Sequence, residues 1–194
     1  MSLLVDFIIS LDGSASAEGW PGWWGLEGPE YLSWLEEENQ RDFTVLMGAN
    51  TYRLMYDFAS QSANLDSEEA GAMDELTAMP KVVFSSTLVD PLPWANTELI
   101  RGDAVEAVAA MKQDGVEMST LGSLTLCRSL LAAGLVDRFR VGIFPVITGA
   151  TGSERIYDGY PDVALKMIAS RTFDGSIQLV EYAPTVLEKP PLAP

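Results

Sequence analysis

The chain has 194 residues, and its 28 acidic and 12 basic side chains give a formal net charge of -16. This length suits a single domain with a sizeable core, and 47% hydrophobic with 21% charged residues is the composition of a folded protein. So large a negative charge repels nucleic acid and anionic membrane surfaces. No apolar run reaches the roughly 18 residues of a membrane span. We therefore expect no nucleic acid and no membrane as partner.

The residue types that are scarce or missing limit the chemistry of the protein. The sequence holds no histidine, and Cys127 is its only cysteine. Ser-His-Asp and Cys-His catalysis, an internal disulfide and the common zinc sites are therefore excluded, and we expect no metal site. Carboxylates, hydroxyls, tyrosines or a bound cofactor must carry any reaction. The N-terminus, MSLLVDFIIS, lacks the basic start of a signal peptide, so we expect a cytoplasmic protein.

The first half of the chain predicts strands and helices that alternate. Strands are predicted at residues 3–9, 43–47 and 81–84. Helices are predicted at residues 30–42, directly after Gly48 and at residues 68–79. The segment 14–29 predicts a loop with three tryptophans, which suits either a lid over a ligand or a cap on the core. In the lid, Trp24 is the candidate substrate contact.

The second half continues this alternation and ends in a hairpin. Strands are predicted at residues 97–100, 116–121 and 135–147, with helices at residues 104–114 and between Gly122 and Gly134. A loop follows at residues 150–162, and Asp174-Gly175 marks a hairpin turn between runs at residues 163–173 and 177–182. We expect one domain over residues 1–183 and a proline-rich, mobile tail over residues 184–194.

Three predicted strands end in residues that suit a phosphate. Gly48 and Gly122 each stand between a strand and a helix, where the unpaired amides of a first helical turn bind anions. A third strand ends in the hydroxyl run Ser85-Ser86-Thr87. Because the carboxyl ends of parallel strands meet at one edge of a sheet, a ligand at this edge is favoured. Ordinary structural turns are the alternative at each junction.

Six short motifs follow one another along the chain. They are SLDG at 10–13, LMGANTY at 46–52, KVVFSSTL at 81–88, LGSLTL at 121–126, GLVD at 134–137 and PVITG at 145–149. In this order they resemble the dihydrofolate reductase-like family, and in particular the branch that includes the reductase domain of bacterial riboflavin biosynthesis. The resemblance implies a three-layer α/β/α fold with a mostly parallel mixed sheet and an antiparallel C-terminal hairpin.

The resemblance also implies an activity, which is hydride transfer from NADPH, with NADH possible, to a small pterin-like or pyrimidine-like heterocycle. The positions that match the family's cofactor site are Gly48, Asn50, Thr51, Ser85, Ser86, Thr87, Leu121, Gly122, Ser123, Leu124 and Thr125. Family members commonly carry arginines where this chain has Ala49 and Ser86, and those arginines pair with the phosphate that separates NADPH from NADH. Arg53 and Arg101 are the nearest basic residues here.

The proton donor and the partners are expectations of the same kind. Glu30 is the acid nearest to the family's helix carboxylate, and Asp12 is a second candidate. The alternatives are an acid in a first helical turn, which the helix dipole favours, for Glu30 and a turn-forming role for Asp12. A homodimer is expected from the family and from the apolar alternation of Val141, Ile143 and residues 163–168. Two other functions stay open, namely a binding protein that keeps the fold without turnover, and an authentic dihydrofolate reductase.

Overall fold

A computed structural model describes residues 2–20, 24–61 and 67–189. The strands are β1 (Leu3–Ser10), β2 (Ser14–Ala17), β3 (Thr44–Gly48), β4 (Lys81–Phe84), β5 (Thr97–Ile100), β6 (Met118–Thr120), β7 (Arg138–Phe144), β8 (Gly152–Arg155), β9 (Val163–Phe173) and β10 (Ile177–Val186). The helices are α1 (Pro29–Asn39), α2 (Ala49–Ser60), α3 (Ser67–Ala78), α4 (Ala104–Gln113) and α5 (Leu124–Ala132). They alternate along the chain as the apolar periodicity predicts.

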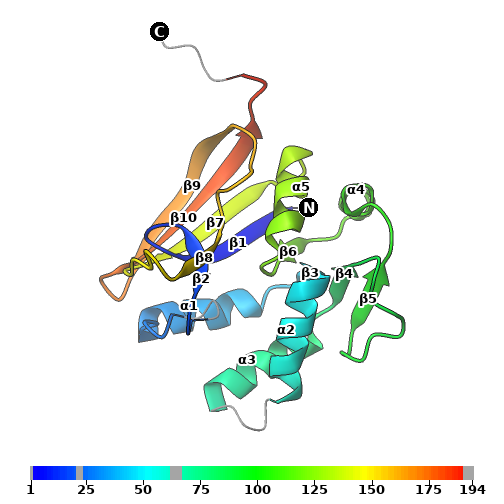
Figure 1. The fold of residues 1–194 in the computed structure, drawn as a ribbon, viewed down its shortest axis with the longest axis horizontal. Helices are drawn as coiled ribbons and strands as arrows, with labels where there is room; N and C mark the ends of the chain where they lie inside the picture. Colours follow the sequence, from blue (N-terminus) through cyan, green and yellow to red (C-terminus); the bar gives the residue numbers. More distant parts are fainter. Residues whose placement is uncertain (1, 21–23, 62–66, 190–194) are drawn as a thin grey trace.

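One large sheet organises the molecule (Figure 1). Its strand order is β5-β4-β3-β6-β1-β7-β10-β9. The neighbouring pairs from β5 to β7 are parallel, while β10 is antiparallel to both β7 and β9. The predicted α/β class, with a mostly parallel sheet and an antiparallel C-terminal hairpin, is confirmed. A separate pair of short strands, β2 and β8, lies beside this sheet.

Helices cover both faces of the large sheet, which makes three layers (Figure 1). The odd positions of β1, from Leu3 to Ile9, pack with α4 and α5 because strand side chains alternate between faces. On the opposite face, α2 and α3 cover β3 and β4, with Tyr52 and Trp94 in the centre of that cluster. α1 covers the end of β7 and the start of β10 with an aromatic cluster that includes Tyr31 and Trp34.

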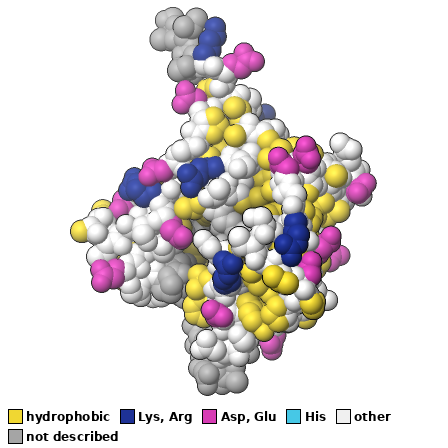
Figure 2. All heavy atoms as spheres, turned by 45° about the vertical axis from the view of Figure 1, so that its right-hand side comes forward, with side chains coloured by type: hydrophobic (Ala, Val, Ile, Leu, Met, Phe, Trp, Pro, Cys, Tyr) yellow, Lys and Arg dark blue, Asp and Glu magenta, His cyan; other side chains and the backbone are white. Residues whose placement is uncertain are grey.

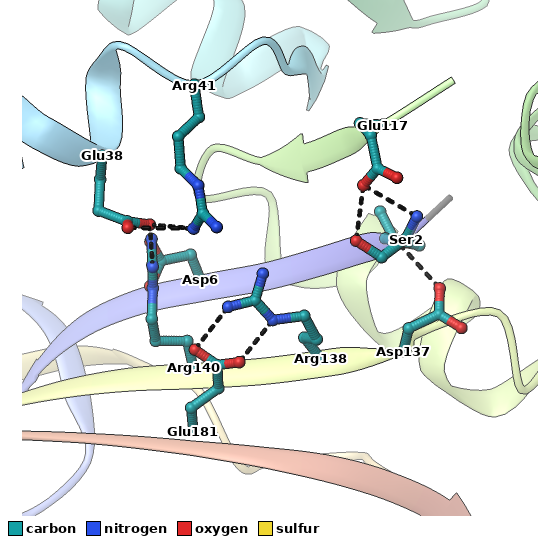
Figure 3. A network of polar contacts seen from close by, with 10 residues as sticks. Ser2, Asp6, Glu38, Arg41, Glu117, Asp137, Arg138, Arg140 and Glu181 are labelled. Atoms are coloured by element: carbon teal, nitrogen blue, oxygen red, sulfur yellow. Dashed lines mark hydrogen bonds and ion pairs between the residues drawn. The ribbon is translucent and has the colours of Figure 1, made fainter. Parts of the chain in front are cut away.

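A charged network lies between α1 and the middle of the sheet (Figure 3). Arg140 on β7 is buried, and its guanidinium contacts Asp6 on β1 at 2.6 Å and Glu38 on α1. Arg138 binds the buried Glu181 of β10 through two hydrogen bonds. Glu181 and Arg140 are also partners in the ladder between β10 and β7. These ion pairs therefore connect β1, β7, β10 and α1, between a helix and a sheet where apolar side chains usually pack.

The structure differs from the sequence-based elements mainly in two loops. β2 and β8 fall in segments that were expected to be irregular, since SASA and GSER have no apolar alternation. They pair with each other in an antiparallel ladder that runs from Ser14 and Arg155 to Ala17 and Gly152. β10 also continues to Val186, past the expected domain end at residue 183, and Val186 pairs with Val163 at the start of β9. Trp23 and residues 190–194 of the expected tail lie outside the described residues.

The expected sheet edge is only partly right. β9 is an outer strand, but β7 lies between β1 and β10, so Val141 is a buried core residue rather than an edge residue.

Within the described residues, no helix combines the length and the apolar character that crossing a bilayer requires. On the face drawn in Figure 2, the Lys and Arg side chains stand apart from one another among acidic and apolar ones. That face therefore presents no continuous basic surface.

The first prediction concerns the charged network. Replacing Arg140 by alanine leaves Asp6 and Glu38 without their shared partner, and we expect the free energy of unfolding to fall by about 3 kcal/mol. Arg41→Ala is the control, because Arg41 also pairs with Glu38 but is exposed, and it is expected to cost about 0–1 kcal/mol. Urea denaturation measures both variants. Equal losses would show that burial of the network carries no weight.

Candidate functional site

The three predicted junctions meet at the carboxyl edge of the sheet. Gly48, at the end of β3, pairs with Phe84 at the end of β4. The amide of Leu121, just after β6, donates to the carbonyl of Leu46 on β3. Ser85 in turn donates its amide to Ile100 at the end of β5. The ends of β3, β4, β5 and β6 therefore form one row, with the helices α2 and α5 beginning beside it.

A single hydroxyl joins the starts of α2 and α5. Ser123 Oγ accepts a hydrogen bond from the Gly48 amide at 2.8 Å and donates to Thr51 Oγ1 at 2.8 Å. Ser123 reaches this position with φ 63° and ψ 58°, and Gly122 before it has φ 53°. Two successive left-handed residues are uncommon, and the non-glycine one carries a strain that its hydrogen bonds offset. We call this arrangement of Gly48, Thr51 and Ser123 the clamp.

The first turns of both helices lack side-chain caps. Gly48, which has no side chain, precedes α2, and the Ser123 hydroxyl does not cap the amides of α5. By contrast, the carboxylate of Asp103 caps α4. Uncapped first-turn amides and the helix dipole attract an anion, and here two such ends lie next to each other. The donors are amides and hydroxyls without bulky side chains, which fits the diphosphate of a dinucleotide.

The serine run after β4 divides into a turn residue and an open hydroxyl pair. Ser85 Oγ accepts the amides of Thr87 and Leu88, both at 3.1 Å, which is a turn-forming role. Ser86 and Thr87 are exposed. Arg53 of α2 donates to Asn50 Oδ1 at 3.2 Å and to Thr87 Oγ1 at 3.5 Å. The guanidinium therefore connects the α2 junction with the β4 junction.

The other predicted cofactor positions lie along the same row. Leu121 and Leu124 are half-buried, and Thr125 is exposed in the first turn of α5. Behind this turn, the buried Cys127 thiol donates to the carbonyl of Gly122 at 3.2 Å. Burial raises the pKa of Cys127 to about 12, so the thiol stays protonated and supports the loop from inside. The structure thus brings the predicted cofactor residues together, and their role in binding stays a prediction.

Asp12 lies near this row, in the loop after β1, but its carboxylate is fully engaged. It accepts the amides of Thr148 and Gly149, both at 3.1 Å, and the Thr148 hydroxyl. The Ser10 hydroxyl and these backbone amides hold the pKa of Asp12 well below its usual range. The side chain is therefore an ionised tie between the β1–β2 and β7–β8 loops, and at neutral pH it has no proton to give.

Glu30 lies elsewhere on the edge. In the first turn of α1, its carboxylate accepts the amide of Asp174, and Asp174 accepts the amides of Glu30 and Tyr31. Asp174 belongs to the turn between β9 and β10, and β10 is three strands away from β6. Glu30 also borders a cavity of about 460 Å³ between α1 and β9. Its observed contacts are those of a helix cap, and its expected role as proton donor stays untested.

Trp24 belongs to the core. Its side chain is 3% exposed and packs with Tyr31, Phe144 and Phe173, with Trp20 against its edge. Of the two alternatives for the tryptophan loop, the cap on the core therefore holds for Trp24. The expectation that its ring stacks on a substrate is not supported, because the side chain is buried.

The sequence did not reveal two features of this edge. One is the clamp, since a serine after a glycine does not disclose that its hydroxyl reaches another helix. The other is an apolar surface beside Asp12, formed by Leu11 after β1 and Ile147 after β7, which are 63% and 69% exposed. Leu11 is held against the chain of Ile147 by a hydrogen bond from its amide to the Val146 carbonyl. Exposure of an apolar side chain is a property of the fold that no local pattern gives.

Comparison with known proteins identifies the family. The family model described as the RibD C-terminal domain matches residues 1–179. The chain belongs to the RibD C-terminal domain family. The resemblance to dihydrofolate reductase-like reductases of riboflavin biosynthesis is thus confirmed.

Other RibD-like proteins show the same fold over nearly the whole chain. A putative riboflavin biosynthesis protein from Shewanella sp. PV-4 superposes with a TM-score of 0.72 at 19% identity, covering 95% of this chain and 99% of that one. A diaminohydroxyphosphoribosylaminopyrimidine deaminase/5-amino-6-(5-phosphoribosylamino)uracil reductase from Thermotoga maritima gives 0.65 at 15% identity. The match covers 95% of this chain but 56% of that bifunctional protein. At these identities the likeness concerns the fold.

A curated relative of this RibD C-terminal domain protein is the uncharacterized protein YyaP of Bacillus subtilis (strain 168). The two chains are 26% identical over 181 residues, which is 93% of each. The family supports an oxidoreductase, and such reductases typically use a nicotinamide cofactor.

The second prediction tests the clamp. Ser123→Ala removes the partner of the half-buried Gly48 amide and of Thr51, and we expect the free energy of unfolding to fall by about 1–3 kcal/mol. Ser129→Ala is the control on the same helix, since Ser129 is exposed and its hydroxyl bonds only the carbonyl of Thr125, and it is expected to change stability by less than about 0.5 kcal/mol. If thermal unfolding shows no difference between the two variants, the clamp is not a stabilising element.

Proposed function

We propose that this protein is a reductase that transfers a hydride from a reduced nicotinamide dinucleotide, NADPH or NADH, to a small pyrimidine-like or pterin-like heterocycle. The observation that carries the proposal is the pair of uncapped helix starts joined by the clamp at the carboxyl edge of the sheet. Membership of the RibD C-terminal domain family supports the same reaction class. A cytoplasmic location is part of this proposal.

The binding part of the proposal relies on backbone amides rather than on cations. The first-turn amides of α2 and α5, with the hydroxyls of Thr51 and Thr125, are suited to hold the diphosphate. The Gly48 amide is already used by Ser123, so it positions the site instead of facing the ligand. Ser86 and Thr87 are suited to contact the adenosine ribose. A protein with a net charge of -16 gains from this arrangement, because fixed local dipoles overcome a repulsive overall field.

We place the hydride transfer at the end of the site that lies near β1 and β7. When bound, the cofactor supplies the hydride that reduces a C=N or C=O carbon of the substrate. Leu11 and Ile147 offer an apolar surface on which a flat ring packs and water is excluded. The carboxylate of Asp12 is ionised, and that of Glu30 accepts the amide of Asp174. We therefore propose that water delivers the proton to the atom next to the reduced carbon.

A binding protein without turnover is the second candidate. It is favoured by the same two carboxylates, since each already accepts hydrogen bonds from backbone amides. An authentic dihydrofolate reductase is less favoured, because Glu30, the candidate helix carboxylate, binds the amide of Asp174 in the β9–β10 turn.

The third prediction tests the dinucleotide site. Gly122 has φ 53°, and a Cβ there would approach the Thr51 side chain at 3.4 Å, so Gly122→Ala is expected to weaken binding of NADPH or NADH by about 10-fold or more. Gly134→Ala is the matched control, since Gly134 has φ 69° and lies at the other end of α5 with open space around it. Titration calorimetry measures the affinities.

Three outcomes of these titrations separate the candidates. Binding of a reduced dinucleotide, followed by its oxidation in the presence of a pyrimidine or pterin from a substrate panel, supports the reductase. Binding without oxidation of any tested compound favours the protein without turnover. The proposal fails if neither dinucleotide binds at millimolar concentration, or if Gly134→Ala weakens binding as much as Gly122→Ala does.

We also propose a homodimer formed through β9. This outer strand has eleven residues, and Leu165, Met167 and Ile168 expose apolar side chains along it. A long exposed strand edge with apolar side chains is unfavourable in a monomer and pairs readily with another strand. The fourth prediction is a sedimentation mass of twice 21.1 kDa for the purified protein, which Met167→Lys shifts towards the single chain. A wild-type mass of one chain would contradict the dimer.

A further inference from the structure

A groove with apolar and charged walls lies between α1 and β9. Its volume is about 460 Å³, and its lining includes Trp34, the acids Glu30 and Glu37, and Arg171. Trp34 is 9% exposed, while the three charged side chains are exposed. An aromatic ring flanked by charges of both signs is suited to a peptide that carries apolar and charged residues.

The strand that borders this groove ends the large sheet. β9 is the outer strand, and its side chains at residues 164–172 are exposed. A second copy that pairs with this edge runs antiparallel to it, because a two-fold axis reverses the direction of the strand. With the axis at Met167 and Ile168, the beginning of the partner's β9 lies opposite residues 171–173.

Such a dimer brings the open end of one hairpin to the groove of the other copy. Val186 at the end of β10 pairs with Val163 at the start of β9, and the next residue, Leu187, donates its amide to the carbonyl of Asp162. The partner's Leu187 is then two strands away from residues 171–173, which is about 10 Å. Two further residues and a long lysine side chain span this distance, so the partner's Lys189 reaches the groove.

Lys189 of the same chain is too far from this groove. β10 begins beside the hairpin turn and α1, and it ends at the opposite end of the hairpin (Figure 1). Leu187 lies eight residues after Leu179, which pairs with Arg171, and this separation is about 26 Å. Lys189 is only two residues further, so its Cα cannot come within about 19 Å of that of Arg171. The segment after β10 can therefore enter the partner's groove but not its own.

The sequence of this segment complements the groove. Residues 187–194 read LEKPPLAP. The exposed Lys189 suits the carboxylate of Glu37, and the exposed Glu188 suits the guanidinium of Arg171. Proline-rich segments lose little conformational entropy when they bind, and they pack on aromatic rings, one of which lines this groove.

We propose that the segment 187–194 docks in the groove between α1 and β9 of a second copy, where Lys189 pairs with the partner's Glu37. Each copy contributes one segment and one groove, as two-fold symmetry requires. This inference rests on the proposed β9 dimer and not on hydride transfer. It adds to the dimer a contact between the hairpin of one copy and α1 of the other.

The fifth prediction is a disulfide between two copies. Ser33 lines the groove and is exposed. In the double variant Ser33→Cys/Lys189→Cys, mild oxidation is expected to yield mainly two linked chains on a non-reducing gel. Each single variant is expected to stay at the mass of one chain, because Cys127 is buried. The control is Glu106→Cys/Lys189→Cys, since Glu106 is exposed on α4, a helix that does not line the groove.

Charge exchange gives a second measurement of the same contact. Lys189→Glu and Glu37→Lys are each expected to raise the dissociation constant of the dimer by about 5-fold, because each places like charges together. The combination of both changes is expected to restore the constant to within about 2-fold of the wild type. Sedimentation equilibrium measures all four proteins.

The inference is overturned if the double cysteine variant links chains no faster than the Glu106 control, if its disulfide forms within one chain, or if the combined charge exchange restores nothing. In each case a wild-type mass of twice 21.1 kDa still supports the β9 dimer. A wild-type mass of one chain removes the dimer and the docking together. Neither result bears on the binding of a dinucleotide, so the proposed reductase is tested separately.

Discussion

The hydrogen bond from the Gly48 amide to Ser123 Oγ is the contact on which the candidate site depends. It joins a residue at the end of β3 to one that is 75 positions later, just after β6. Without it, the ends of two neighbouring strands still lie side by side, but nothing orients the first turns of α2 and α5 towards one ligand. The clamp needs Ser123 in a left-handed conformation, which its hydrogen bonds to Gly48 and Thr51 offset.

A second set of contacts fixes α1, which stands apart from this site. Asp174 accepts the first amides of α1, and a Cβ on Gly28 would lie 2.2 Å from its carboxyl carbon. The β9–β10 turn therefore packs directly against the start of α1, and only a glycine at position 28 leaves room for Asp174. Glu38, near the other end of α1, meets the buried Arg140. Held at both ends, α1 keeps Glu30 and Glu38 in structural contacts, with the amide of Asp174 and with Arg140.

Charge shapes the rest of the surface. The chain has 28 acidic and 12 basic side chains, and Arg41, Arg138 and Arg140 each pair with a carboxylate. An anionic ligand would therefore be bound mainly by amides and hydroxyls. The carboxyl edge presents such groups. The first-turn amides of α2 and α5 lie there with the hydroxyls of Thr51, Ser86 and Thr87, and the Arg53 guanidinium lies beside Thr87.

The sequence by itself determined the order of strands and helices, the parallel sheet with its final hairpin, and the strand ends at Gly48, Ser85 and Gly122. Apolar periodicity and turn residues are local, so they can be read along the chain. Only the tertiary structure decided that Trp24 is buried, that Glu30 and Asp12 are tied to backbone amides, and that Ser123 and Arg53 each bridge two junctions. These features depend on contacts between residues far apart in the chain, and the energy of such a contact is set by packing that no single segment contains.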